Sequence, residues 1–157
     1  MDPRYFAQEI IMPRIKLALK EEYPFTCEIQ VRVGDLNYGG HVGNSEMVGI
    51  LHDARVALFR SMGVHEGDLG DGKTGIVMDD LVVNFRAEAF LGDNLTVGCA
   101  FGEVGEAGFR IHYHVTCSGK TVAVAETGLV AFNYAARRIA FLPAVFKAKA
   151  LDFGCGN

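Results

Sequence analysis

The chain has 157 residues, half of them apolar and 22% charged, a composition typical of one globular domain rather than a disordered chain. Its formal charge is −4 at pH 7 and it contains no basic block, which argues against nucleic acid or an anionic membrane surface as a partner. No apolar run approaches the ~18 residues that a membrane-spanning helix needs.

Four cysteines are spread along the chain without a CxxC pair, namely Cys27, Cys99, Cys117 and Cys155. They lack the closely spaced ligand pairs of a structural zinc site. Residues 1–22 carry charges throughout and lack the uninterrupted apolar core of a signal peptide. We therefore expect reduced thiols in a cytoplasmic protein.

The first segment, residues 3–20, places apolar side chains such as Ile10 and Leu17 at helical spacing. Pro13 interrupts the segment and would kink a helix or divide it in two. We expect residues 1–22 to form a helical N-terminal arm that packs against the body of the protein. A helix lying on a membrane surface is the less favoured alternative.

Residues 25–33 alternate between apolar and polar types and are rich in β-branched side chains, which predicts a strand. After a glycine-rich loop, residues 44–62 predict one long helix. Its apolar stripe consists of Met47, Ile50, Leu51, Ala54, Leu58 and Met62. Asn44 or Ser45 is expected to cap the start of this helix, and Gly63 its end.

Four strands separated by short turns are predicted after the helix, over residues 75–87, 94–104, 108–117 and 120–134. Short connections between consecutive strands imply antiparallel pairing. The order of one strand, a long helix and four strands predicts an α+β fold, in which a mostly antiparallel sheet of five or six strands wraps the central helix. We place this domain at residues 23–144 and expect a tail over residues 145–157 that contains a short helix.

Residues 67–74 match the phosphate-loop pattern GxxxxGK[ST] at each fixed position. That pattern binds phosphate only where it joins a buried strand to a helix N-terminus. Here the helix precedes the segment and a strand follows it, and Asp68 and Asp71 would repel a phosphate. We therefore interpret the match as a solvated loop.

Three polar side chains stand out on the predicted strands. His112 and His114 share one face of a strand, as zinc ligands sometimes do, but no third ligand has a suitable spacing. Glu126 lies among apolar neighbours and is either a buried acid in a site or part of a strand face at an edge or interface. A strand face is the favoured interpretation for all three. It is an outer or interfacial face for the two histidines, and a face at an edge or interface for Glu126.

The loop before the long helix gathers groups that can do chemistry. Asp35, Asn37 and His41 bring a carboxylate, an amide and an imidazole close together in sequence. The loop ends at a helix N-terminus, where backbone amides and the helix dipole can polarise a carbonyl oxygen. These features favour an acyl-transfer or hydrolysis site about as much as a capped, hydrogen-bonded turn.

This stretch resembles the hot-dog thioesterases of the 4-hydroxybenzoyl-CoA type, whose pattern runs R-x-x-D-x-D-x-x-G-H-V-x-N and then a helix ending E-x-A-R. The matching residues are Arg32, Asp35, Gly40, His41, Val42, Asn44 and Ala54-Arg55. The family's V-x-Y-R and G-D segments also have similar counterparts downstream, which are Val83-Asn84-Phe85-Arg86 and Leu91-Gly92-Asp93.

The resemblance implies a hot-dog fold and hydrolysis of an acyl thioester of CoA or of an acyl carrier. It also implies a homodimer with sites at the subunit interface, often assembled into a homotetramer, and neither a metal nor an organic cofactor. Gly40 and Asn44 would bind the substrate, with the backbone amide of Asn44 as the donor to the oxyanion.

One departure from the family pattern concerns the catalytic carboxylate, which is the second Asp of D-x-D and is replaced here by Asn37. An amide is neither a base nor a useful nucleophile, although it can orient a water or a thioester carbonyl. His41, Asp35 or an acid of another subunit would then have to activate water. His41 suits general-base catalysis near neutrality.

Two alternatives to a hydrolase stay open. The stretch is also similar to the G-D-x-N-P-x-H motif of the (R)-specific enoyl-CoA hydratases, but the proline is absent and Asp35 and His41 lie one position further apart. The other alternative is a non-catalytic protein that binds acyl thioesters on the same scaffold. Thioester hydrolysis is the favoured function.

Overall fold

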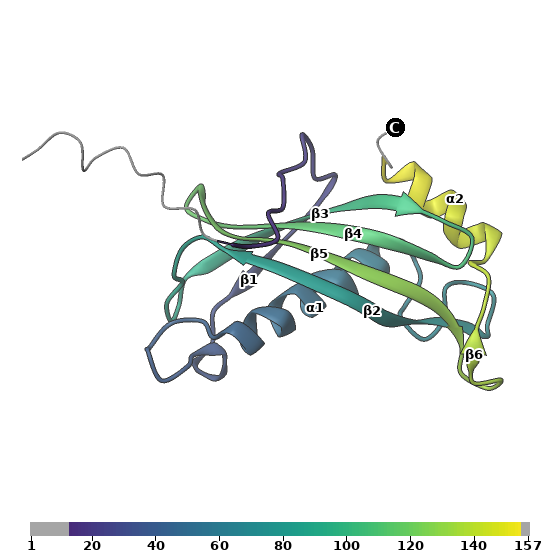
Figure 1. Cartoon of the computed structure of the whole chain (residues 1–157), viewed down its shortest axis with the longest axis horizontal. Helices are drawn as coiled ribbons and strands as arrows, with labels where there is room; N and C mark the ends of the chain where they lie inside the picture. Colours follow the sequence, from purple (N-terminus) through teal and green to yellow (C-terminus); the bar gives the residue numbers. More distant parts are fainter. Residues whose placement is uncertain (1–12, 155–157) are drawn as a thin grey trace, which may run out of the picture.

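The computed structural model describes residues 13–154 and contains six strands and two α-helices within them (Figure 1). The elements are, in chain order, β1 (Phe25–Gln30), the 3-10 helix η2 (Val33–Asp35), α1 (Asn44–Ser61), β2 (Thr74–Phe85), β3 (Asn94–Val104), β4 (Gly108–Cys117), β5 (Lys120–Asn133), β6 (Arg138–Ile139) and α2 (Ala144–Asp152). The predicted order of elements is confirmed. The first strand is shorter than predicted because its expected last residue, Val33, begins η2 instead.

All six strands belong to one antiparallel sheet in the order β1-β3-β4-β5-β2, with β6 paired to β5. The helix α1 runs along one face of this sheet (Figure 1). This is the predicted α+β arrangement, a sheet that wraps a long central helix, and it confirms the hot-dog fold.

The core lies between α1 and the inward face of the sheet. The six predicted stripe residues of the helix are all buried. The strictest alternation occurs on β4, whose buried inward side chains are Phe109, Ile111, Tyr113 and Val115. Burial of each large apolar side chain contributes roughly 1.5–3 kcal/mol, so this interface supplies much of the stability that holds α1 against the sheet.

The short helix expected near the C-terminal end is confirmed as α2. Its Phe146 is buried against three other rings, with centroid separations of 5.7 Å to Phe59, 6.1 Å to Phe101 and 4.9 Å to Phe109. These separations are typical of aromatic pairs that stabilise beyond their buried area. Because its core side chain joins rings of α1, β3 and β4, α2 closes one end of the core.

The helix predicted over residues 3–20 is wrong for its described part, since residues 13–20 are irregular; residues 1–12 lie outside the described residues. The side-chain amide of Asn84 holds this segment, accepting from Leu17 N at 2.8 Å and donating to Ile15 O at 2.8 Å. A helix would already pair these backbone groups internally. Tertiary hydrogen bonds therefore replace the helical ones in this part of the arm.

The described part of the arm lies on the face of the sheet opposite α1 (Figure 1). Directly after the arm, the Tyr23 ring packs on His114 of β4 with a centroid separation of 5.4 Å. Val124 pairs with both Asn84 and His114 on this outer face, and only 3% of its surface is exposed. The described part of the arm thus packs against the body, as expected, but as an irregular segment.

The caps of α1 differ from the prediction at one end. Gly43 is the N-cap, no side chain caps the helix, and Asn44 is its first residue, so the predicted cap by Asn44 or Ser45 is wrong. The predicted end is confirmed at Gly63, which has φ +73°, a conformation that glycine adopts without steric cost. None of the helices within residues 13–154 is long and apolar enough to cross a bilayer.

Candidate active site

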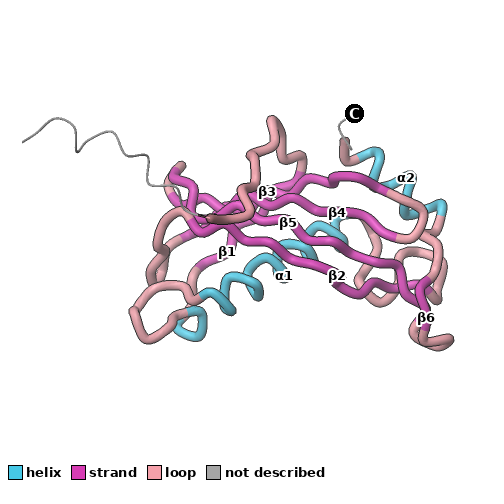
Figure 2. Tube along the Cα trace, viewed as in Figure 1, coloured by secondary structure: helices cyan, strands magenta, loops and turns pink. Residues whose placement is uncertain are grey.

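The loop from β1 to α1 lies at the end of the domain where α1 begins (Figure 2). Its first turn is closed by Asp35, whose carboxylate accepts a hydrogen bond from Arg32 N at 2.8 Å. The carbonyl of Asp35 also accepts from Gly43 N at 3.1 Å. Asp35 is buried, with 7% of its surface exposed, so its carboxylate holds the loop in place.

The middle of the loop is a tight turn built around Asn37. The Asn37 side-chain oxygen accepts from Gly39 N at 2.9 Å, and the Asn37 carbonyl accepts from Gly40 N at 3.0 Å. Gly40 has φ +77°, which side chains with a Cβ rarely adopt. Gly40 therefore serves the turn directly, and the bonds of the turn leave the donors of the Asn37 side-chain NH₂ group unused.

The imidazole of His41 follows this turn and is partly exposed. Its Nδ1 lies 3.1 Å from the carbonyl oxygen of Val42. A carbonyl oxygen can only accept, so Nδ1 carries the proton and the neutral ring presents the lone pair of Nε2. His41 thus has the tautomer that a general base requires.

Asn37 and His41 border the same small space. A Cβ placed on Gly39 would lie 3.0 Å from His41 Nε2 and 3.2 Å from the Asn37 side-chain oxygen. The glycine therefore leaves open a volume that both polar groups face. The structure brings the predicted pair together there.

A cavity of about 280 Å³ joins this loop to the start of α1 and the end of β2. Its lining residues are His41, Val42, Asn44, Met47, Phe85, Arg86, Ala87, Glu88, Ala89 and Val122. Of the predicted site residues, His41 and Asn44 line this cavity. Asp35, Asn37 and Gly40 shape the loop behind it and are not among the lining residues.

The N-terminus of α1 presents backbone amides at this cavity. Since no side chain of residues 13–154 caps α1, its first backbone amides keep their capacity to donate to a ligand, and the helix dipole concentrates positive charge there. Asn44 is the first helical residue and lines the cavity. A carbonyl oxygen in the cavity can therefore be polarised by the helix N-terminus.

The segment after β2 was missed by sequence reasoning as part of the site. Val42 N donates to Ala89 O at 2.9 Å, and His41 forms an isolated antiparallel bridge with Phe90. This pairing places Glu88 beside the imidazole, with Glu88 Oε1 3.7 Å from His41 Nε2. No spacing in the sequence signals the contact, because the two segments lie far apart along the chain.

A family model described as the thioesterase-like superfamily matches residues 31–150. The chain belongs to this superfamily. No protein of curated function matches it by sequence.

Solved thioesterase structures share the fold. A 1,4-dihydroxy-2-naphthoyl-CoA thioesterase from Synechocystis is 23% identical with a TM-score of 0.74, over 82% of this chain and 96% of that one. A thioesterase from Thermus thermophilus, complexed with coenzyme A and Zn, is 25% identical with a TM-score of 0.72, over 85% and 96%. The gentisyl-coenzyme A thioesterase BH1999 is 17% identical with a TM-score of 0.72, over 80% and 99%.

The superfamily pattern on the central helix ends in Ala54-Arg55, and Arg55 is a buried cation here. Its Nε donates to Glu66 Oε1 at 2.5 Å, and His52 Nε2 lies 2.8 Å from Glu66 Oε2. Burial tends to raise the pKa of Glu66, but the hydrogen bonds from Arg55 and His52 outweigh it and lower that pKa. Arg55 also faces Tyr113, whose pKa burial raises to about 12.

Two of these groups, His52 and Arg55, line a second cavity of about 110 Å³ between α1 and β2. The network ties the helix to the loop that precedes β2, since Glu66 belongs to that loop. A buried pair of this kind needs both partners, because removing one leaves an uncompensated buried charge.

The segment that matches the phosphate-loop pattern satisfies its own amides. Asp68 accepts from Gly70 N and Gly72 N, each at 2.8 Å. Asp71 accepts from the Thr74 amide at 2.8 Å and from its hydroxyl at 2.7 Å. The amides that would hold a phosphate are thus bound to carboxylates, in agreement with a solvated loop.

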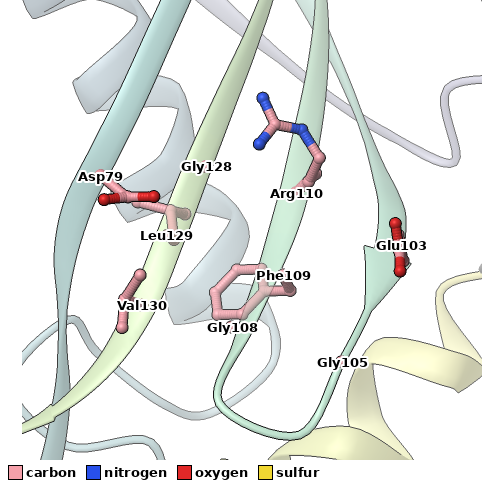
Figure 3. A pocket seen from close by; sticks show the side chains of 9 residues that line it. All are labelled: Asp79, Glu103, Gly105, Gly108, Phe109, Arg110, Gly128, Leu129 and Val130. Atoms are coloured by element: carbon pink, nitrogen blue, oxygen red, sulfur yellow. The ribbon is translucent and has the colours of Figure 1, made fainter. Parts of the chain in front are cut away.

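The polar residues of the predicted strands form a network on the outer face of the sheet. Arg110 binds Asp80 through Nη1 at 2.9 Å and Nη2 at 2.6 Å, and its Nε donates to Glu126. His112 Nδ1 lies 3.5 Å from Glu126 Oε2. Arg110 is also one of the side chains that line a neighbouring cavity of about 250 Å³, as Figure 3 shows.

Glu126 is therefore an ion-paired residue of a strand face, but β5 lies between β4 and β2, so the predicted position at a sheet edge is wrong. His114 lies on the same face and contacts the Thr121 hydroxyl at 2.9 Å, and burial lowers its pKa. Among residues 13–154, no three His, Cys, Asp or Glu side chains gather in a way that could hold a metal ion.

Proposed function

We propose that this protein hydrolyses acyl thioesters and that acyl-CoA is its substrate. The observation that carries the proposal is the cavity shared by His41 and the uncapped N-terminus of α1. It combines a base of suitable tautomer with donors for a developing oxyanion, the two requirements of thioester hydrolysis. Membership of the thioesterase-like superfamily supports the same chemistry.

In the proposed reaction, the thioester carbonyl oxygen accepts a hydrogen bond from the Asn44 amide. His41 Nε2 removes a proton from a water, whose oxygen attacks the carbonyl carbon. Collapse of the tetrahedral intermediate breaks the C–S bond, and the proton on Nε2 passes to the departing sulfur. The Asn37 side-chain oxygen borders the same space as Nε2, and the NH₂ group at the other end of this amide orients the water.

The remaining predicted site residues have supporting roles in this proposal. The Asp35 carboxylate is engaged by the Arg32 amide inside its own turn, which favours His41 over Asp35 as the base. Gly40 does not line the cavity, so it supports substrate binding indirectly, through the positive φ that shapes the turn before His41.

We further propose a homodimer or homotetramer with the site at a subunit interface. Within the described residues, β2 pairs only with β5 and leaves its other edge unpaired over a long strand, which is a template for pairing with another chain. Phe85, at the end of this strand, is 47% exposed and lines the candidate cavity. A partner strand would therefore lie close to the site. Light scattering that shows a monomer at micromolar concentration would contradict this assembly.

The choice of CoA over an acyl carrier is supported by the fold shared with the thioesterase complexed with coenzyme A. A cytoplasmic location is proposed from the three described cysteines, which are free thiols.

A panel of saturated acyl-CoA and 2-enoyl-CoA substrates, followed by thiol release and by hydration of the double bond, tests the function. We expect thiol release from saturated acyl-CoA. Hydration of the enoyl thioester without thiol release would make the protein a hydratase. Binding of acyl-CoA with neither reaction would make it a non-catalytic binder, the alternative that Asn37 favours. His41→Ala should lower the rate of thiol release about 10²–10⁴-fold, and His65→Ala, which removes an exposed imidazole outside the cavity, should leave it unchanged.

A further inference from the structure

We propose that Glu88 is a positioning residue of the candidate site, whose carboxylate stabilises the imidazolium that His41 forms when it takes a proton from water. The proposal rests on the proposed function and adds to it the carboxylate that position 37 lacks.

The first step of the argument is the direction of the His41 ring. Because Nδ1 donates to the Val42 carbonyl oxygen at 3.1 Å, the other nitrogen is turned toward Glu88, at 3.7 Å from Oε1. In the neutral ring both Nε2 and the carboxylate are acceptors, so no hydrogen bond joins them, and a separation of 3.7 Å is what such a pair allows.

Protonation of Nε2 changes this relationship. The imidazolium is a donor at both nitrogens, with the Val42 carbonyl at one and the Glu88 carboxylate at the other. A small side-chain movement then converts the 3.7 Å separation into a charge-assisted hydrogen bond, about twice as strong as a neutral one. The contact is therefore strongest in the charged state of the ring that the proton transfer from water creates, which is the condition for raising the rate.

The backbone around Glu88 is held firmly. The next residue, Ala89, is 1% exposed and accepts the hydrogen bond from Val42 N, and Phe90 forms the bridge to His41. The Glu88 side chain itself is 63% exposed, so it can adjust its position while its backbone stays beside the imidazole.

Other polar groups near His41 come from each element packed around it. Arg86 lines the same cavity, and Asn37 faces Nε2 across Gly39. Glu46 of α1 is the competing carboxylate, because a Cβ on Gly43 would lie 1.8 Å from its Oε2 and 3.2 Å from the Asn37 Cβ. Glu46 thus borders the back of the loop and does not line the cavity, whereas Glu88 lines it together with His41.

The proton and electron balance of the step is complete without a further reactant. Water gives a proton to His41 Nε2 and an oxygen to the carbonyl carbon, the C–S bond breaks, and Nε2 returns the proton to the sulfur. Glu88 gains and loses no proton in this sequence. Its negative charge stabilises the imidazolium between the two proton transfers.

Glu88→Gln tests the proposal because it keeps the shape of the side chain and removes its charge. We expect kcat for acyl-CoA hydrolysis to fall about 10–100-fold with KM little changed. The double variant Asn37→Asp with Glu88→Gln should recover much of the lost rate by returning a carboxylate to the same space.

Glu21→Gln, which removes an exposed carboxylate of the arm, is the matched control and should retain the wild-type kcat and KM. Circular dichroism and thermal melting show whether each variant is folded. If the wild type hydrolyses acyl-CoA and Glu88→Gln does so with the same kcat, the role of Glu88 is refuted while the proposed function stands. The role of Glu88 would also be refuted if Glu46→Gln lowered the rate of hydrolysis and Glu88→Gln did not. A wild type without hydrolysis refutes both, and NMR spectra that place the neutral-pH proton of His41 on Nε2 refute the base and its positioning residue together.

Discussion

The replacement Asn37→Asp is the sharpest perturbation of the candidate site. The fold should accept it, because a carboxylate oxygen can take the hydrogen bond that the Asn37 side-chain oxygen now receives from Gly39 N. The new charge would face the space bordered by His41 Nε2. Two unit charges about 4 Å apart interact by roughly 1 kcal/mol in bulk water and about 4 kcal/mol near a protein surface. His41 is partly exposed, so the lower half of that range applies.

About 1.4 kcal/mol corresponds to a factor of ten in rate, so we expect thiol release from acyl-CoA to rise roughly tenfold in this variant. The assay is continuous detection of free CoA thiol with saturated acyl-CoA substrates at neutral pH. Asn37→Ala is the control, since it removes orientation without adding a charge, and it should lower the rate. Rates within about twofold of the wild type for both variants, far below the tenfold that this interaction predicts, would show that the loop is structural and that the chemistry takes place elsewhere.

Three further predictions concern the framework that positions the site. Phe146→Ala should lower the free energy of unfolding by about 3–5 kcal/mol in urea titrations, because Phe146 joins three other rings; a loss below about 1 kcal/mol would contradict that packing. The pKa of Glu66 is held below its ordinary value of 4.5 by Arg55 and His52 despite its burial. The stability that this adds is complete above pH 4.5 and is lost as the pH falls through the lowered pKa. The difference in unfolding free energy between wild type and Glu66→Gln should therefore be constant above that pH and shrink below it, and a difference that grows on acidification would refute the assignment. Asn84→Ala removes both hydrogen bonds to the arm and should speed proteolytic cleavage within residues 13–24 severalfold, with no change in cleavage rate as the contrary result.

The cavity beside the ionic network of His52, Arg55 and Glu66 is the second one that α1 shares with β2. The cavity that His52 and Arg55 line lies farther along α1 than the one with His41 and Asn44. Both cavities also include residues of β2, Met78 and Phe85 respectively. If the unpaired edge of β2 meets a second subunit, as proposed, both cavities lie near that interface. Assembly and catalysis should then fail together when the edge is disrupted.

The sequence by itself determined the features that depend on neighbouring residues. Alternation on β4 and the apolar stripe of α1 are local periodicities, and each one identifies the face of its element that must be buried. The turn at Gly63 follows equally from one residue whose backbone tolerates a positive φ. The loop that carries Asn37, His41 and Asn44 was also recognisable as a candidate site, because its polar groups are close in sequence and the loop ends at a helix N-terminus.

Tertiary structure decided what distant residues impose on one another. The described part of the arm is irregular rather than helical because Asn84, on β2, takes up the backbone groups of Ile15 and Leu17. Glu88 becomes part of the site only because Ala89 and Phe90 pair with the loop that holds His41. Such contacts bring together residues from different parts of the chain, and their energies depend on burial and geometry that no local pattern encodes.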